Sequence, residues 1–172
     1  MVEIRQLSAE ETRRHLGALA GVLLDCVAGG ASVSFMASLT RTQAEAFFEA
    51  VWQGVHRGER ILLAAFDDSQ LIGTVQIVNA SAPNQPHRAD IAKLLVHRSA
   101  RGQGVAGRLM RRAEEASLRA GKTLLTLDTV TGSVAEKLYA SLGWTRVGVI
   151  PNYAQYPDGR WCDTTIFFKN LA

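Results

Sequence analysis

Residues 93–108 read KLLVHRSARGQGVAGR, an apolar strand followed by a short basic turn, glycines and the start of a helix. Glycines at a strand-to-helix junction leave backbone N–H groups free to face a ligand, and the N-terminus of a helix carries partial positive charge. Arg101 adds a fixed charge beside these glycines, and a guanidinium suits phosphate better than a mobile ammonium does. The stretch therefore predicts a binding site for a phosphate-bearing ligand.

The segments around this turn predict a mixed sheet with helices on both faces. Alternating or continuous apolar runs predict strands at 2–7, 61–66, 71–78, 89–96, 123–128, 144–150 and 164–169. A capping box at Ser8 and Glu11 begins a helix that ends at Gly29 and Gly30. Further helices are expected from Thr40 (another capping box), from 104 to 120, and from Ser133 to Leu142. The segment between the last two strands is expected to be a loop.

Length and composition bound the class of protein. The 172 residues suit one domain (1–172), and no apolar run is long enough to span a bilayer. The first residues lack the layout of a signal peptide, so we expect a cytoplasmic protein. Cys26 and Cys162 form no CxxC pattern and are expected to be idle thiols, while the four histidines lack the paired spacing of metal ligands.

Charge is distributed unevenly, although the net charge is only +3. Between Arg98 and Lys122 there are seven basic residues and two acids. Arg101 and Arg108 lie within a turn of the glycines and are candidates for contacting an anionic ligand, whereas the other arginines suit a solvated helix face. Because no aromatic residues are interleaved with these charges, nucleic acid is not an expected partner.

The glycine turn has two interpretations. Gly102, Gly104 and Gly107 match the GxGxxG fingerprint of dinucleotide-binding proteins, and Asp128 follows at a suitable distance for a ribose contact. However, that fingerprint should follow its strand at once and open the first βαβ unit, whereas here residues 97–101 intervene and most of the sheet comes earlier. A nicotinamide dinucleotide is therefore the less favoured ligand.

The alternative pattern is Arg101-x-x-Gly104-x-Ala106, which resembles the Q/R-x-x-G-x-G/A signature of the GNAT superfamily of N-acyltransferases. The segment GSVAEKLYASLGW (132–144) resembles the second conserved block of that family. The order of predicted elements also resembles the family along the whole chain. The resemblance implies the acyl-CoA N-acyltransferase fold, with a mixed, mostly antiparallel seven-stranded sheet, and acetyl-CoA as the cosubstrate without a metal.

Site residues follow from the same resemblance. The strand at 94–96 would pair with the pantetheine arm, a bulge near Leu94 or Leu95 would expose an amide for the oxyanion, and the turn would bind the pyrophosphate. The residues expected to bind the cofactor are Leu94, Leu95, Val96, Arg101, Gly102, Gln103, Gly104, Val105, Ala106, Gly107 and Ser133.

Three residues are candidates for catalysis. Tyr139 resembles the family's general acid, which would protonate the departing thiolate. Asp90 and Asp128 lie at the ends of predicted neighbouring strands, where ligands of open sheets bind, and either or both could take the proton of the amine. The sequence does not rank these two acids. Transfer is expected to be direct, without an acyl-enzyme.

The expected acceptor is the amine, or the hydroxyl, of a small amino-acid-like molecule, and several segments resemble a toxin-inactivating branch of the family. Its recognition is expected to involve loops 29–38, 79–88 and 152–162. The alternatives are a non-catalytic CoA-binding sensor and a protein or peptide N-acetyltransferase. The chain could act as a monomer or a homodimer.

Overall fold

A computed structural model describes residues 1–171. Its strands are β1 (Val2–Leu7), β2 (Arg60–Asp67), β3 (Gln70–Asn79), β4 (Arg88–Val96), β5 (Leu124–Val130), β6 (Thr145–Gln155) and β7 (Trp161–Asn170). Its helices are α1 (Ala9–Arg14), α2 (Leu16–Ala28), α3 (Arg41–His56), α4 (Val105–Arg119) and α5 (Val134–Ser141), with a 3₁₀ turn η1 at Arg98–Ala100. Every predicted strand is present, and so is every predicted helix, although the first is divided into two.

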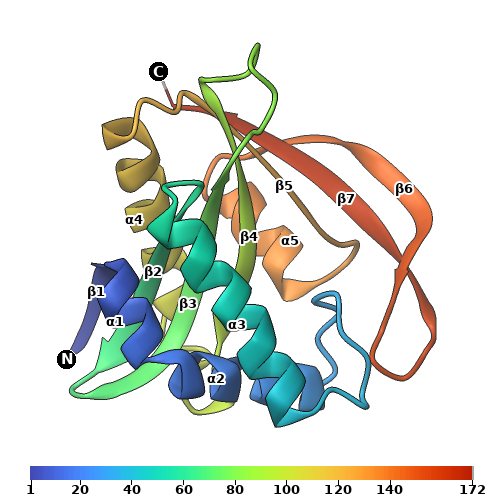
Figure 1. Cartoon of the computed structure of the whole chain (residues 1–172). Helices are drawn as coiled ribbons and strands as arrows, with labels where there is room; N and C mark the ends of the chain where they lie inside the picture. The colour runs from blue at the N-terminus through green and yellow to red at the C-terminus, as the bar shows by residue number, and fades with distance from the viewer. Residues whose placement is uncertain (172) are drawn as a thin grey trace.

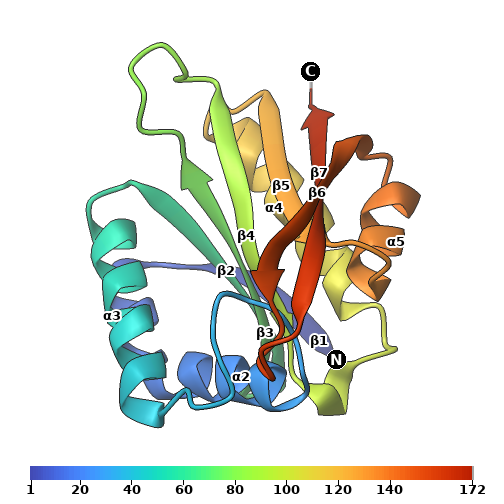
Figure 2. The same cartoon turned by 90° about the vertical axis from the view of Figure 1, so that its right-hand side faces the viewer.

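The sheet has seven strands in the order β1-β2-β3-β4-β5-β7-β6 (Figure 1). The pair β4–β5 is parallel, because α4 crosses over between these strands, and the other neighbouring pairs are antiparallel. Helices α1 to α3 cover one face, while α4 and α5 cover the other (Figure 2). The predicted mixed sheet with helices on both faces is thus confirmed.

Local signals explain where most helices begin. Ser8 and Thr40 both form complete capping boxes, with Glu11 and Gln43 respectively. The first predicted helix is in fact two helices, because the helical conformation is interrupted at His15, between α1 and α2. The His15 N–H group closes the last turn of α1, and its carbonyl accepts from Leu19, so both helices use this residue.

The predicted loop between the last two strands is mostly strand. Ala154 and Gln155 of β6 pair with Cys162 and Trp161 of β7, so the hairpin extends well beyond the expected ends. The register is irregular between Ile150 and Ala154. Sequence reasoning missed this extension because Pro151 argues against a strand, yet proline is tolerated on an edge strand such as β6.

The parallel pair β4–β5 is short, and this shapes the site. Pairing is confined to three residue pairs, from Arg88 opposite Leu124 to Asp90 opposite Thr126. Beyond Asp90 the two strands separate, so residues 91–96 have no partner in β5. β5 instead continues to Val130 along β7. The sheet therefore consists of a half with β1–β4 and a half with β5, β7 and β6, joined at one end.

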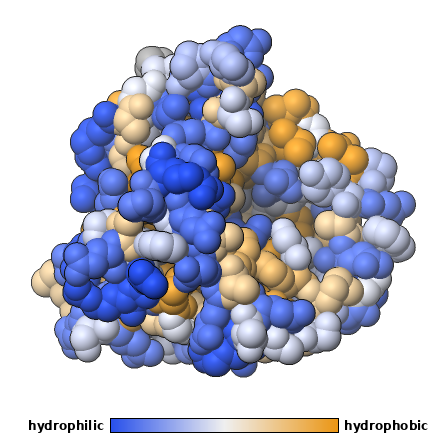
Figure 3. All heavy atoms as spheres, viewed as in Figure 1, coloured by the Kyte–Doolittle hydropathy of each residue, from blue (hydrophilic) through white to orange (hydrophobic). Residues whose placement is uncertain are grey.

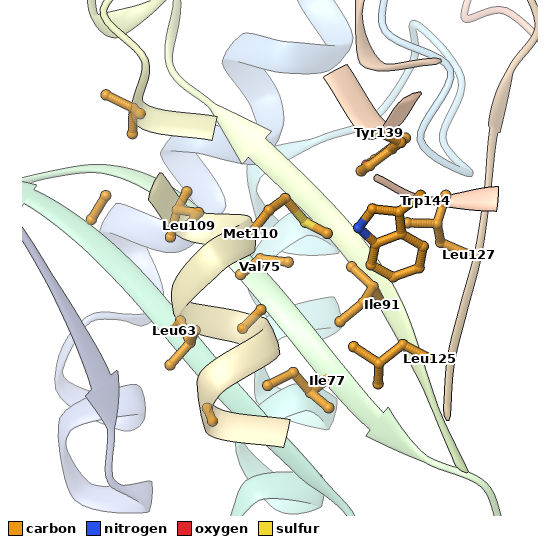
Figure 4. Close-up of a cluster of buried hydrophobic side chains, with 14 of the residues drawn as sticks. Leu63, Val75, Ile77, Ile91, Leu109, Met110, Leu125, Leu127, Tyr139 and Trp144 are labelled. Carbon is orange, nitrogen blue, oxygen red and sulfur yellow. The ribbon is translucent and has the colours of Figure 1, made fainter. Parts of the chain in front are cut away.

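Two apolar clusters fill the space between sheet and helices. One lies under α4 and α5 and includes Leu109, Met110, Tyr139, Trp144 and Phe167 (Figure 4). The other lies under α2 and α3 and is built around side chains such as Leu23 and Phe48. Each buries large side chains completely, which is the main stabilising contribution expected for a domain of this size. Within residues 1–171, no helix is both long and apolar enough to cross a membrane.

Candidate active site

The glycine turn leads directly from η1 into α4. Gly102 and Gly104 have φ angles of 75° and 74°, a left-handed conformation that residues with a Cβ rarely adopt. Gly104 is the N-cap of α4 and provides no side chain to satisfy the first-turn amides. In an α-helix these amides have no partner within the helix, so they are available to an anion. The predicted amide cradle therefore exists in the folded chain.

Other residues of the turn have packing roles. Val105 is buried, and a Cβ on Gly107 would lie 3.7 Å from Leu138, so the Leu138 side chain of α5 packs beside the start of α4. The Gln103 side chain folds back and donates to the Ser99 carbonyl oxygen at 3.0 Å. These contacts give the cradle a fixed shape.

The Arg101 guanidinium is held by the protein. Its Nε donates to the Val96 carbonyl oxygen at 3.1 Å, and one terminal nitrogen lies 3.7 Å from Cys26 Sγ and 4.0 Å from Asp25. Asp25 also accepts from the backbone and side chain of Arg98. Asp25 of α2 thus holds the turn through Arg98 and Arg101, and no local sequence signal identifies it. A contact between Arg101 and a phosphate stays a prediction.

Arg108 is also engaged, because it donates to the Val2 carbonyl oxygen at 2.6 Å. This contact joins α4 to the first strand. A contact between Arg108 and an anionic ligand stays a prediction. Ser133 similarly caps α5 by accepting from the Glu136 N–H at 3.1 Å, so its expected contact with the cofactor stays a prediction.

A bulge interrupts β4 where the two halves of the sheet separate. Thr74 of β3 faces Leu95 and Gln76 faces Ala92, so Lys93 and Leu94 together oppose Val75. Lys93 has a φ of 52°, the left-handed region. A bulge leaves a backbone group without its ladder partner. The bulge expected near Leu94 is therefore present, beside the strand edge that β5 leaves unpaired.

We call the gap between β4 and β5 beyond Asp90 the opening. Tyr139 projects from α5 into the apolar cluster beneath it (Figure 4). Its ring lies 6.0 Å from both Trp144 and Phe167, and the side chain is 5% exposed. No protein group in residues 1–171 forms a hydrogen bond with its hydroxyl. Burial, and to a lesser extent the charge of Asp128, raise the pKa of Tyr139 well above its ordinary value. The phenol therefore keeps its proton at neutral pH.

The two candidate acids differ in their surroundings. Asp90 accepts from Arg88 at 2.6 Å and from Thr126, at the end where β4 and β5 are paired. Asp128 lies two residues beyond Thr126 on β5, on the same face, and is exposed. It accepts from Thr164 Oγ1 at 3.0 Å and has no cation within 4.0 Å in the described chain. Asp128 is therefore the freer of the two.

Loops 29–38 and 152–162 meet on the outer side of the opening. Ser32 donates to the Gln155 carbonyl oxygen at 2.7 Å, and the Ala37 N–H donates to the Pro157 carbonyl oxygen at 3.1 Å. A cavity of about 230 Å³ lies between these loops, beside Gly30 and Tyr156. Figure 3 shows a hollow between the helical part and the β6–β7 hairpin. Loop 79–88 lies at the opposite end of β4, at the top of Figure 1, and does not join the other two.

Comparison with known proteins agrees with this geometry. Residues 24–144 match the Acetyltransferase (GNAT) family, which covers both the glycine turn and α5. The chain belongs to the GNAT family of acetyltransferases. The protein is accordingly an acyltransferase, and GNAT acetyltransferases use acetyl-CoA as the acetyl donor.

Solved GNAT structures superpose over the entire chain. An N-acetyltransferase from Staphylococcus aureus Mu50 has a TM-score of 0.82 at 20% identity, covering 100% of this chain and 99% of its own. A Salmonella typhimurium structure with its cofactor acetyl-CoA has a TM-score of 0.81 at 19% identity, covering 100% of this chain and 95% of its own. A candidate phosphinothricin N-acetyltransferase has a TM-score of 0.83 at 19% identity, covering 100% of this chain and 99% of its own. At these identities the likeness concerns the fold, and it confirms the predicted acyl-CoA N-acyltransferase fold.

The fold of this acetyltransferase also decides between the two interpretations of the glycines. A dinucleotide-binding unit would place the fingerprint after the first strand of a parallel sheet, whereas here it follows β4 of a mixed sheet. The residues present fit an acyl-CoA: free amides at the glycine turn for a pyrophosphate, and the unpaired edge at 91–96 for an extended polar arm. No group of three or more His, Cys, Asp or Glu side chains in the described chain could hold a metal ion.

Proposed function

We propose that this acetyltransferase transfers an acetyl group directly to the amine of a small amino-acid-like molecule, within one acetyltransferase domain. The observation that carries the proposal is the position of Tyr139 and Asp128 at the opening between β4 and β5. An acid that retains its proton and an exposed carboxylate meet there, close enough for the charge of Asp128 to raise the pKa of Tyr139. Amine acetylation requires one group of each kind.

Binding of the donor uses the backbone. The amides of Gly102, Gln103, Gly104, Val105, Ala106 and Gly107 would hold the pyrophosphate, and Leu94, Leu95 and Val96 would pair with the pantetheine arm. Acetyl-CoA supplies the activated acetyl group as a thioester. The bulge at Lys93 and Leu94 would present an amide to the oxygen that becomes negative.

Proton transfer uses the side chains. Asp128 would remove a proton from the acceptor ammonium, since an amine attacks a carbonyl carbon only through a free electron pair. Tyr139 would give its proton to the departing sulfur. The attacking nitrogen would lose its second proton to solvent as the amide forms, and the phenolate would recover a proton from solvent. Both steps occur in one ternary complex, without an acyl-enzyme. Cys26 is poorly suited to be a nucleophile, because it is buried and burial raises the pKa of its thiol.

Of the two candidate bases, we favour Asp128. The charge of Asp128 acts on both Tyr139 and Lys93, which supports a role for its carboxylate beside these two groups. Asp90 is instead bound to Arg88 and Thr126, where β4 and β5 are paired. Asp90 would then stabilise the closed end of the sheet.

The acceptor class rests on a finer resemblance. Several stretches are similar to those of the tabtoxin-resistance acetyltransferase, which inactivates a toxin that contains a β-lactam amino acid. These stretches are GGASVSFM (29–36), KLLVHRSARGQG (93–104), LDTVTGSVAEKLY (127–139), TRVG (145–148), PDGR (157–160) and FFK (167–169). Two of them, 29–36 and 157–160, belong to the loops that meet beside the opening. One solved structure with the same fold is a candidate phosphinothricin N-acetyltransferase, so we include phosphinothricin among the acceptors to be tested.

A thiol-release screen tests the proposal. Purified protein is mixed with acetyl-CoA and a panel of acceptors: free amino acids, β-lactam amino acids, phosphinothricin, simple amines and short peptides. Acetylated product is confirmed by mass. We expect turnover with amino-acid-like compounds, and Asp128→Asn should reduce kcat far more than Asp90→Asn. Turnover of peptides alone would indicate a peptide acetyltransferase, and binding of acetyl-CoA without turnover of any acceptor would indicate a sensor.

A further inference from the structure

The bulge in β4 places a lysine in an unusual setting. Lys93 is half-buried, and its Nζ donates to Ser34 Oγ at 3.0 Å across the opening from loop 29–38. The same ammonium lies 5.9 Å from the centre of the Phe47 ring. No carboxylate in the described chain lies within 4.0 Å of it. A partly desolvated ammonium without a counter-ion is unfavourable, because the ammonium loses bound water and gains no opposite charge in exchange.

Asp128 is the complementary group. Its charge acts on Lys93, since it raises the lysine pKa against the lowering caused by burial. The two nevertheless remain more than 4.0 Å apart and form no ion pair with each other or with other side chains of the described residues. Lys93 and Asp128 are thus two opposite charges beside the opening, and neither forms an ion pair within the described residues.

The backbone also shows that these positions are specialised. Lys93 and Ser34 have φ angles of 52° and 77°, and neither is glycine. Left-handed residues with a Cβ are uncommon and concentrate at functional sites. Here two of them, 59 residues apart in the chain, are joined by their side chains.

We propose that Lys93 binds the carboxylate of the acceptor, with Ser34 as a second donor, so that the preferred acceptors are amino acids and analogues with a free acidic group. The ammonium of such a zwitterion faces Asp128, which removes its proton, and the carboxylate faces Lys93. The two charges of the acceptor then neutralise the two unpaired charges of the opening. This assignment rests on the proposed function and adds the group that selects the acceptor.

The test compares an amino acid with its neutral carboxamide, using the best amino-acid acceptor from the screen. We expect wild-type protein to favour the acid in kcat/KM by about 10- to 150-fold, the range for a hydrogen bond to a charged group. With Lys93→Met, this preference should fall to within about threefold, chiefly through a higher KM for the acid. Lys93→Arg should retain part of the preference. The KM for acetyl-CoA should stay unchanged in all variants.

The outcomes separate the two proposals. If wild-type protein acetylates the acid and the carboxamide equally well, or if Lys93→Met lowers kcat equally for both, the assignment of Lys93 is overturned while the acetyltransferase function stands. If no amine is acetylated, the proposed function itself fails. Ser34→Ala provides a milder variant should Lys93→Met fold poorly. We expect Ser34→Ala to reduce the preference for the acid over the carboxamide by a smaller factor than Lys93→Met does. An unchanged preference in Ser34→Ala would count against the proposal.

Discussion

Replacement of Tyr139 by phenylalanine separates chemistry from stability. The Tyr139 hydroxyl forms no hydrogen bond within residues 1–171, and the ring contacts with Trp144 and Phe167 do not involve the oxygen. Phenylalanine therefore preserves the packing and removes only an unpaired polar group. Because the substitution keeps the ring and breaks no hydrogen bond within the described residues, we expect the free energy of unfolding to stay within about 0.5 kcal/mol of the wild-type value.

The effect on the reaction should be much larger. Loss of a general acid typically lowers the rate by about 10²- to 10⁴-fold. At about 1.36 kcal/mol for each factor of ten, this corresponds to roughly 3–5 kcal/mol of transition-state stabilisation. The kcat of Tyr139→Phe should fall in this range, while the affinity for acetyl-CoA stays at the wild-type value. A change in kcat that is several kcal/mol larger than the change in stability would assign the hydroxyl to catalysis.

The assay is thiol release at saturating acetyl-CoA and acceptor, accompanied by urea unfolding and by calorimetry with acetyl-CoA. Tyr153→Phe is the matched control, because Tyr153 lies on β6 and is 53% exposed. It should leave the free energy of unfolding and the affinity for acetyl-CoA unchanged. If Tyr139→Phe keeps kcat within threefold of wild type, the acid is another group and the role assigned to Tyr139 is refuted.

Three further predictions concern the turn, the core and pH. Gly104→Ala should cost roughly 1–2 kcal/mol of unfolding free energy, because φ is 74° although a Cβ meets no atom within 4 Å, and it should weaken acetyl-CoA binding measured by calorimetry. Gly17→Ala, inside α2, should instead be neutral or stabilise by about 0.5–1 kcal/mol. Phe48→Ala should cost about 3–5 kcal/mol in urea unfolding, more than Phe35→Ala at a half-buried position. Because the pKa of Tyr139 is raised, folded and unfolded chains both keep this proton below about pH 10, and only the unfolded chain loses it just above. The kcat of wild-type protein should therefore show no decline from deprotonation of Tyr139 up to about pH 10. Above that pH, the free energy of unfolding of the wild type should fall more steeply with pH than that of Tyr139→Phe. Equal slopes of unfolding free energy against pH would contradict the raised pKa.

Much of the fold could be predicted because its signals are local. Capping boxes at Ser8 and Thr40 fix helix starts within four residues of sequence, and the left-handed glycines mark the turn before α4. The β4–β5 parallel pair follows from the intervening helix. Such features depend on neighbours along the chain, so a single sequence is enough to detect them.

The features that were missed depend on distant partners. Asp25 receives Arg98 from 73 residues away, and Lys93 reaches Ser34 from 59 residues away. Nothing next to Asp25 or Lys93 in the sequence distinguishes them from ordinary surface charges. The same holds for the end of β6, where pairing with Trp161 and Cys162 overrides the proline signal. The roles of Tyr139, Asp90 and Asp128 stay predictions, although the structure describes the surroundings of each.

The separation of β4 from β5 has a consequence for aggregation. An unpaired strand at the outside of a sheet invites other chains to add to it, and proteins usually block such edges. Residues 91–96 pair with β3 but have no partner on the side of β5. This open side lies inside the sheet, flanked by the β5–β7–β6 half, so a flat sheet from another molecule is hindered from approaching it. A single thin polar chain can still enter. The protein thereby keeps a row of main-chain groups ready for an elongated small molecule while shielding them from association with its own kind.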